Sequence, residues 1–175
     1  MTRESKSSAA RIFLLIGRLI LAGIFLFAAY AKLKPQTTVP WSASSVKISL
    51  SMFALQVDSY QLLPVKLVSP VAHLLPPGEL FLGLWLLTGI ALRFSSLAAS
   101  LLIGGFFSVV VRTYAMGLEI NCGCFGPGER LGVGTIVRDA SLLALALAVT
   151  IVAFWIRSRG EPSSSSALPA PQRAD

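Results

Sequence analysis

The chain has 175 residues, of which 54% are hydrophobic and only 13% are charged, and its formal net charge is +7. A soluble domain carries about 25% charged residues, so this composition excludes an ordinary soluble domain and favours a membrane protein. The basic residues are scattered along the chain rather than gathered into one patch, which argues against nucleic acid as a partner.

Four apolar segments are each long enough to cross the lipid bilayer as a helix. A helix of about 20 apolar residues spans about 30 Å of hydrocarbon. The predicted spans cover residues 12–31, 67–92, 94–116 and 134–156. The sequence therefore predicts an all-α integral membrane protein, a four-transmembrane-helix bundle within a membrane domain of residues 11–157.

The first apolar run follows Arg3, Lys6 and Arg11, as the core of a secretory signal peptide follows basic residues. Its apolar stretch is longer than the usual core of about 7 to 15 residues, and no polar mature domain follows it. We therefore expect an uncleaved first span.

The connections between the predicted spans differ in length. Residues 32–66 are too many for a simple hairpin, and residues 46–60 mix apolar and polar positions as a short interfacial helix does. The connection near Arg93 is so short that the second and third spans should form a tight pair. Pro76 and Pro77 should kink or interrupt the second span. Residues 158–175 are rich in Ser, Pro and Ala, which predicts a disordered polar tail.

The basic residues indicate an orientation in the membrane. Seven of them fall on one side if the four spans are correct: Arg3, Lys6, Arg11, Arg93, Arg157, Arg159 and Arg173. The positive-inside rule then favours cytoplasmic termini, and the loop between the third and fourth spans faces outward. We expect a multi-pass protein of the bacterial inner membrane.

Glu79 is the deepest acidic residue in the predicted spans. Ionisable residues inside the membrane are costly and are usually paired. The candidate partners are Arg18, Arg112 and Arg138, of which Arg112 and Arg138 are favoured because they flank the same loop. Arg138 and Asp139 are adjacent on a helix and should find separate partners. These charges either fix the packing of the helices or place an Arg where it stabilises a cysteine thiolate.

The only two cysteines are Cys122 and Cys124, which flank Gly123 in the loop between the third and fourth spans. A disulfide needs Cα atoms about 4.4 to 6.8 Å apart, so this pair can close only if the chain turns between them. Gly123 makes that turn easy because glycine tolerates positive φ. Strained, exposed disulfides are labile and suit exchange with another thiol protein.

Two other interpretations of the cysteine pair stay open. The thiols could be inert, or they could bind a soft metal together with other ligands. Structural zinc requires four ligands, and the only histidine, His73, lies in a different span, where packing or a hydrogen bond explains it more simply. We therefore assign no metal site within one chain.

Six short elements of the sequence resemble a known family. They are Ala29–Leu33, Tyr60–Pro64, Leu75–Glu79, Leu86–Gly89, Cys122–Gly126 and Arg138–Asp139. In this order they resemble the MauE-type methylamine-utilisation membrane proteins, within the broader DoxX-like group, over about residues 11–156. The Cys-Gly-Cys-Phe-Gly element is the most specific of the six.

The resemblance implies a four-helix membrane protein that acts in the maturation of methylamine dehydrogenase, a disulfide-rich enzyme, beside a thioredoxin-like partner. It maps the family's cysteine pair onto Cys122 and Cys124, its acidic residue onto Glu79 and its arginine onto Arg138. The tail after residue 157 lies outside the resemblance.

We therefore expect a redox-associated membrane protein that exchanges thiol–disulfide equivalents with an extracytoplasmic thioredoxin-like protein. One of the two cysteines would attack and the other would resolve the mixed disulfide, with Gly123, Glu79, Arg112 and Arg138 in supporting roles. The electrons could pass to or from a second thiol protein or a membrane quinone. The alternative is a non-enzymatic assembly factor or small-solute carrier, so whether the protein is an enzyme stays open.

Overall fold

The computed structural model describes residues 3–35, 40–62, 64–118, 120 and 131–160. These residues form five helices and no strands. The helices are α1 (Arg3–Leu33), α2 (Ala43–Ser59), α3 (Val65–Thr88), α4 (Leu92–Ala115) and α5 (Val133–Gly160).

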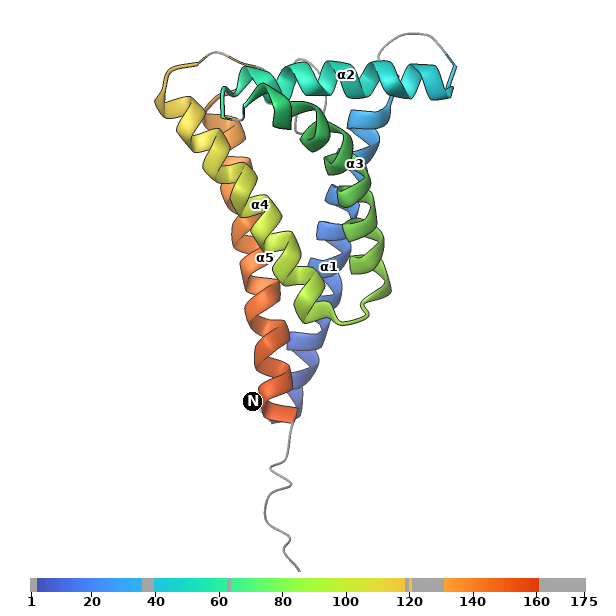
Figure 1. Ribbon diagram of the computed structural model, residues 1–175. Helices are drawn as coiled ribbons and strands as arrows, with labels where there is room; N and C mark the ends of the chain where they lie inside the picture. The colour runs from blue at the N-terminus through green and yellow to red at the C-terminus, as the bar shows by residue number, and fades with distance from the viewer. Residues whose placement is uncertain (1–2, 36–39, 63, 119, 121–130, 161–175) are drawn as a thin grey trace, which may run out of the picture.

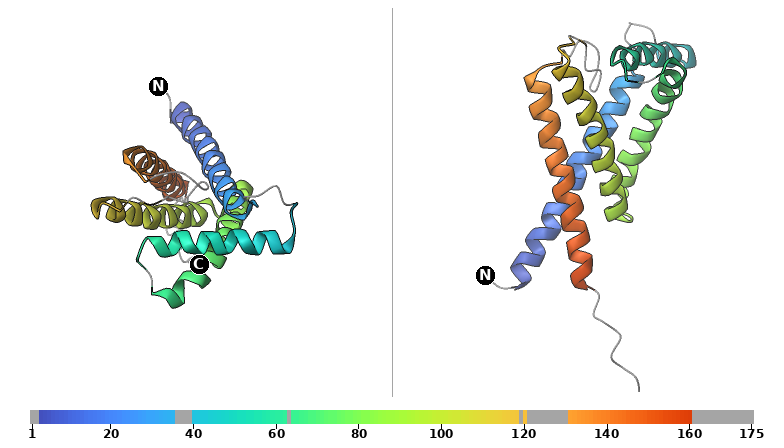
Figure 2. Two further views of the ribbon diagram at one scale, coloured as in Figure 1. Left: turned by 90° about the horizontal axis from the view of Figure 1, so that it is seen from above. Right: turned by 60° about the vertical axis from the view of Figure 1, so that its left-hand side comes forward.

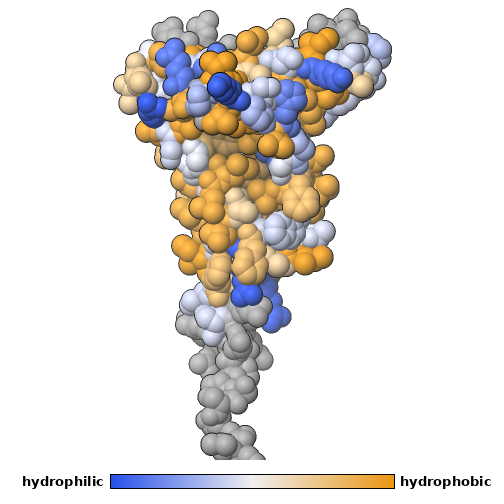
Figure 3. Space-filling view, viewed as in Figure 1, coloured by the Kyte–Doolittle hydropathy of each residue, from blue (hydrophilic) through white to orange (hydrophobic). Residues whose placement is uncertain are grey.

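Four of the helices are long and apolar enough to cross a membrane: Ser8–Leu33 within α1, Val65–Thr88, Leu92–Ala115 and Val133–Ile156. They coincide with the four predicted spans to within a few residues, so the prediction of a four-helix membrane bundle is confirmed. Figure 3 shows apolar residues around the middle of the molecule and hydrophilic residues gathered toward its two ends.

The spans form two pairs that diverge toward one end of the bundle. α1 packs mainly against α3, and α4 packs mainly against α5. Figure 1 shows the pairs close together near the termini and far apart at the other end, where α2 lies across them. The two views in Figure 2 show the same arrangement, with α2 lying across the end of the spans. α2 is the predicted short helix between the first two spans, and it begins three residues earlier than the predicted segment.

Serine residues cap the start of α2 and join it to the end of α1 by hydrogen bonds. At its start, Ser42 Oγ accepts a hydrogen bond from Ser45 N at 3.2 Å, and Ser45 Oγ accepts one from Ser42 N at 2.9 Å. This reciprocal pair is a capping box, which satisfies backbone donors that the helix leaves free. One turn later, Ser49 Oγ donates to Lys34 O at 3.1 Å, which ties α2 to the carboxyl end of α1.

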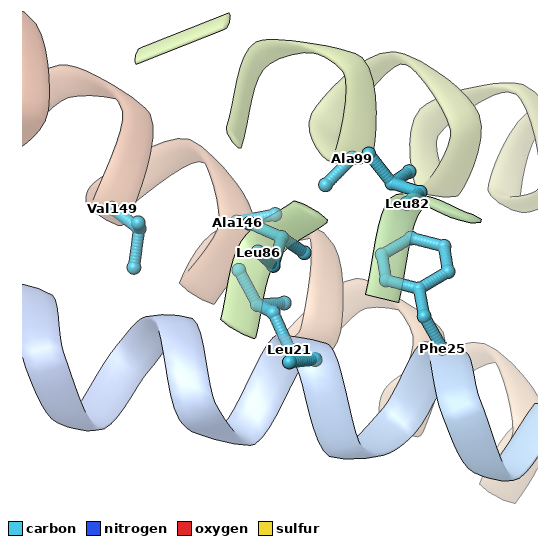
Figure 4. Packing of buried hydrophobic residues seen from close by; sticks show 8 residues of the cluster. Leu21, Phe25, Leu82, Leu86, Ala99, Ala146 and Val149 are labelled. Carbon is cyan, nitrogen blue, oxygen red and sulfur yellow. The ribbon is translucent and has the colours of Figure 1, made fainter. Parts of the chain in front are cut away.

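The apolar core lies in the half of the bundle nearer the termini. Its buried residues include Leu21 and Phe25 of α1, Leu82 and Leu86 of α3, Ala99 of α4, and Ala146 and Val149 of α5 (Figure 4). Small residues let the backbones approach one another, as is common between helices in membranes. A Cβ atom added at Gly83 would lie 3.0 Å from the side chain of Leu26 and 3.3 Å from Ala22 O.

α3 is a continuous helix although it contains Pro70, Pro76 and Pro77. Each proline lacks the N–H that would bond the carbonyl four residues earlier, which bends a helix. In Figure 1 the first part of α3 runs beneath α2 and the second part descends beside α1. The predicted kink is therefore present, and the predicted interruption is not.

α5 continues to Gly160, three residues beyond the predicted boundary of the membrane domain. Residues 161–175 lie outside the described residues, so the disorder of the tail remains a prediction.

Candidate functional site

The predicted cysteine site lies outside the described residues, but the residues on both sides of it are described. Leu131 N donates a hydrogen bond to Ile120 O at 2.9 Å, so the two flanks of segment 121–130 meet. α4 ends at Ala115 and α5 begins at Val133, so Cys122, Gly123 and Cys124 fall between the spans. Figure 1 shows that both helix ends lie at the same end of the bundle as α2.

A buried ion pair occupies the space beneath α2. Lys32 Nζ lies 2.8 Å from both carboxylate oxygens of Glu79. The two side chains are only 3% and 4% exposed. A charge buried here without a partner would strongly destabilise the folded protein, so each of the two charged side chains is stabilised by the other.

The basic partner expected for Glu79 is present, but it is Lys32 and not Arg112 or Arg138. The prediction ended the first span at residue 31 and assigned Lys32 to the following loop. α1 instead continues to Leu33. Lys32 therefore projects from the same face as Phe25 and Ala28, which are buried at positions seven and four residues earlier. This periodicity, together with the presence of Lys32 in the Ala29–Leu33 element, is the sequence signal that could have identified Lys32 as the partner of Glu79.

Two aromatic rings lie close to the Lys32 ammonium group. Its Nζ lies 5.4 Å from the centroid of the Phe53 ring in α2 and 5.9 Å from the centroid of the Phe106 ring in α4. Both distances are within the range of cation–π attraction. Phe53 is buried on the inner face of α2, so α2 contributes directly to this site.

Lys32, Glu79 and Asp139 line one pocket of about 50 Å³. Its remaining walls are apolar and come from Ile24, Phe25, Ala28, Ile103, Phe106 and Leu142. A space of this size admits water where polar groups are available to bind it. With Phe53, all five helices meet at this site, in the widening space between the two helix pairs.

Arg138 and Asp139 contact each other, although separate partners were expected. Arg138 Nε donates to Asp139 Oδ1 at 2.9 Å. Adjacent helical positions point in different directions, but the long arginine side chain bends back far enough to bridge them. Asp139 is 6% exposed and lines the same pocket as Glu79, so Arg138 is joined to the buried site through Asp139.

The other candidate residues lie away from the pocket. Arg112 is exposed in the last turn of α4, where a cation is favoured by the helix dipole. Arg18 packs against Gly89 at the end of α3, near the termini. His73 is exposed, and its Nδ1 lies 2.8 Å from Ser69 O, which agrees with the predicted hydrogen-bonding role.

Residues 10–153 match a protein family described as "Methylamine utilisation protein MauE". The chain belongs to this family. The match includes most of the first and fourth spans, the whole of the second and third, α2, the cysteine segment and the pocket residues Lys32, Glu79 and Asp139. Comparisons with curated proteins and with solved structures each find no match. The protein is thus a multi-pass membrane protein of the MauE methylamine-utilisation family.

Proposed function

We propose that this MauE-family protein exchanges thiol–disulfide equivalents with a thioredoxin-like protein outside the cytoplasm, through Cys122 and Cys124. The observation that supports it most directly is the hydrogen bond between Leu131 N and Ile120 O. It joins the flanks of the cysteine segment at the end of the bundle, beyond the membrane spans. A cysteine pair within a membrane span would be out of reach of a water-soluble protein, and Cys122 and Cys124 fall between two spans in the sequence.

The exchange reaction needs both cysteines. One thiolate attacks a disulfide of the partner and forms a mixed disulfide, and the second thiolate displaces the partner from it. The partner leaves with two thiols, and Cys122 and Cys124 are joined as a disulfide. The reverse sequence transfers a disulfide to the partner.

The proposed orientation places the termini in the cytoplasm. One end of the bundle holds the amino-terminal end of α1, the first turn of α4 with Arg93, and the carboxyl end of α5 with Arg157 and Arg159 (Figure 1). The positive-inside rule assigns this end to the cytoplasm. The cysteine segment then faces the compartment in which disulfides persist.

The described residues near the segment have supporting roles in this proposal. The Lys32–Glu79 pair joins α1 to α3, and Asp139 in α5 lines the same pocket as that pair. Together they fix the end of the bundle from which the segment extends. Arg112 lies in the last turn of α4, on the amino-terminal side of the cysteine segment, and its proposed role is to favour a cysteine thiolate.

Single-cysteine variants test the exchange function. We expect one of Cys122→Ser and Cys124→Ser to trap a mixed disulfide with a thioredoxin-like partner, and both to lose exchange while the helices stay folded. The matched control is Ser108→Ala, on the exposed side of α4, which should change neither property. Full activity with one cysteine would contradict exchange and support the alternative of an assembly factor whose cysteine only tethers its partner.

Labelling tests the orientation independently. A membrane-impermeant maleimide added to intact cells should modify Cys122 and Cys124 after reduction. Labelling that requires permeabilised cells would show the opposite orientation. The cysteines would then face the cytoplasm, where disulfides do not persist.

A further inference from the structure

The inner face of α1 carries a cation toward each end of the bundle. Lys32 lies seven residues after the buried Phe25, and Arg18 lies seven residues before it. Residues seven apart return to about the same face of a helix, so the three form one stripe. Lys32 is paired with Glu79. The two cations therefore occupy equivalent positions at opposite ends of the core, and they differ in their partners.

Arg18 has no acidic partner among the residues that the structure describes. Its guanidinium group makes no hydrogen bond or ion pair with them, and its Nε is buried without an acceptor. It contacts Gly89 at the carboxyl end of α3, where the helix dipole favours a cation. Ionisable side chains within membrane spans are usually paired, so Arg18 requires a counter-ion from elsewhere.

The helices carry the nearby acidic parts of the chain away from Arg18. Glu4 precedes Arg18 by 14 residues on the same continuous helix, a distance of about 21 Å. A Cβ added at Gly17, the neighbour of Arg18, would meet the side chain of Val149, so these parts of α1 and α5 lie side by side. From Val149, α5 continues for 11 residues to Gly160, which is about 16 Å along its axis.

The surroundings of Arg18 are apolar and belong to the membrane spans. Arg18 lies ten residues into the first span, beside the turn between α3 and α4. Figure 1 shows that α1 and α5 continue past this turn, and the right-hand view of Figure 2 agrees. Leu19 and Ile90 are exposed apolar residues next to it. Lipid is therefore the medium that covers this part of the bundle, and the anion that a bilayer supplies is the phosphate of a lipid headgroup.

The Arg18 side chain can take part in such a contact as it stands. The residue is partly exposed, and Nε is its only nitrogen that is buried without a partner. Guanidinium nitrogens bind phosphate oxygens through paired hydrogen bonds. Arg93, in the first turn of α4, adds a second positive charge after the same turn, and its guanidinium carbon lies 4.7 Å from the centroid of the Phe94 ring. Basic sites between spans commonly bind anionic headgroups on the cytoplasmic side of a membrane.

We propose that Arg18 binds the phosphate of an anionic phospholipid beside the α3–α4 turn, with Arg93 adding to the positive potential there. The lipid supplies at this end of the α1 stripe the counter-ion that Glu79 supplies at the other end. The site is independent of the thiol–disulfide exchange proposed above.

Native mass spectrometry of the full chain tests the lipid site. The protein is released from detergent after titration with dioleoylphosphatidylglycerol, which is anionic, or with dioleoylphosphatidylcholine, which is zwitterionic. We expect one molecule of the anionic lipid to bind at least about tenfold more tightly than the zwitterionic lipid. Equal binding of the two lipids, or no retained lipid, would overturn the proposal. Sodium phosphate at the same concentration should not displace the lipid, and displacement would show a site for a free anion instead.

Two matched variants separate a specific site from a general attraction between charges. Arg18→Gln and Arg11→Gln each remove one positive charge from α1, but Arg11 is exposed. Arg18→Gln should weaken binding of the anionic lipid by about tenfold, whereas Arg11→Gln should change it by less than about twofold. Equal effects would overturn the site. Arg18→Lys keeps the charge for a folded protein but loses the forked donor, so it should also weaken binding, and unchanged affinity would overturn the assignment to Arg18.

A further variant separates the lipid from the carboxyl-terminal tail of the chain itself. Glu161→Gln/Asp175→Asn removes the two acidic side chains that follow α5. It should change neither lipid binding nor the melting temperature in detergent. A fall in melting temperature as large as that of Arg18→Gln would identify the tail as the counter-ion of Arg18 and overturn the proposal.

Discussion

The two ends of the bundle are built in different ways. Near the termini the helices converge on an apolar core around Leu21 and Leu86, with Gly83 at a close helix contact. Near α2 the helix pairs diverge, and the space between them holds the Lys32–Glu79 pair and Asp139. One end is stabilised by close apolar packing, and the other contains a buried pair of charged side chains. Charges so placed cost stability unless paired, which is why intramembrane charges commonly mark functional sites.

The largest loss of stability should come from removing one partner of the Lys32–Glu79 ion pair. Lys32→Met leaves Glu79 buried without its cation and should lower the free energy of unfolding by about 3–5 kcal/mol. Thermal unfolding of the purified protein in detergent measures the loss. Lys47→Met, an exposed position on α2, is the matched control and should have little effect.

The double variant Lys32→Met/Glu79→Leu sharpens this comparison. Replacing both charges removes the buried unpaired group, so the double variant should be more stable than Lys32→Met alone. If the double variant were less stable than the single variant, the charged end would depend on Glu79 for more than its pairing with Lys32.

A smaller effect should follow from overpacking the apolar end. Gly83→Val places side-chain atoms against Leu26 and the backbone of Ala22, and should cost about 1–3 kcal/mol of unfolding free energy. Gly23→Val makes the same change on the same bundle where an added Cβ meets nothing within 4 Å. Similar melting temperatures for the two variants would show that the helices near the termini are not closely packed.

The smallest expected effect concerns a neutral hydrogen bond between α4 and α5. Ser100 Oγ lies 3.0 Å from Thr150 Oγ1, and both residues are buried. A double-mutant cycle with Ser100→Ala and Thr150→Val should give a coupling of about 0.6 kcal/mol, as measured for similar bonds in membranes. A coupling energy as large as that between Lys32 and Glu79 would show that the neutral hydrogen bond stabilises the bundle as much as the buried ion pair does.

Hydropathy was sufficient to predict the four spans and the position of α2 between the first two, because a bilayer requires long apolar helices. It did not identify the partner of Glu79. The apolar run ends at Ala31, but the helix does not, so Lys32 was placed in a loop although it occupies the inner face of α1. The pocket itself depends on how far the two helix pairs diverge, and that angle arises from contacts between residues distant in the chain. The contact between Arg138 and Asp139 depends on a side-chain conformation that helical spacing does not determine.

The turn between α3 and α4 has a consequence for sequence variation in this family. Gly89 has a φ of +68°, which disfavours any residue with a side chain, and Arg18 of α1 occupies the space where that side chain would lie. Two independent constraints therefore act on position 89. The next residue, Ile90, is 69% exposed and carries neither constraint. Among relatives that keep an arginine at position 18, we expect position 89 to remain glycine, whereas position 90 should vary among apolar residue types.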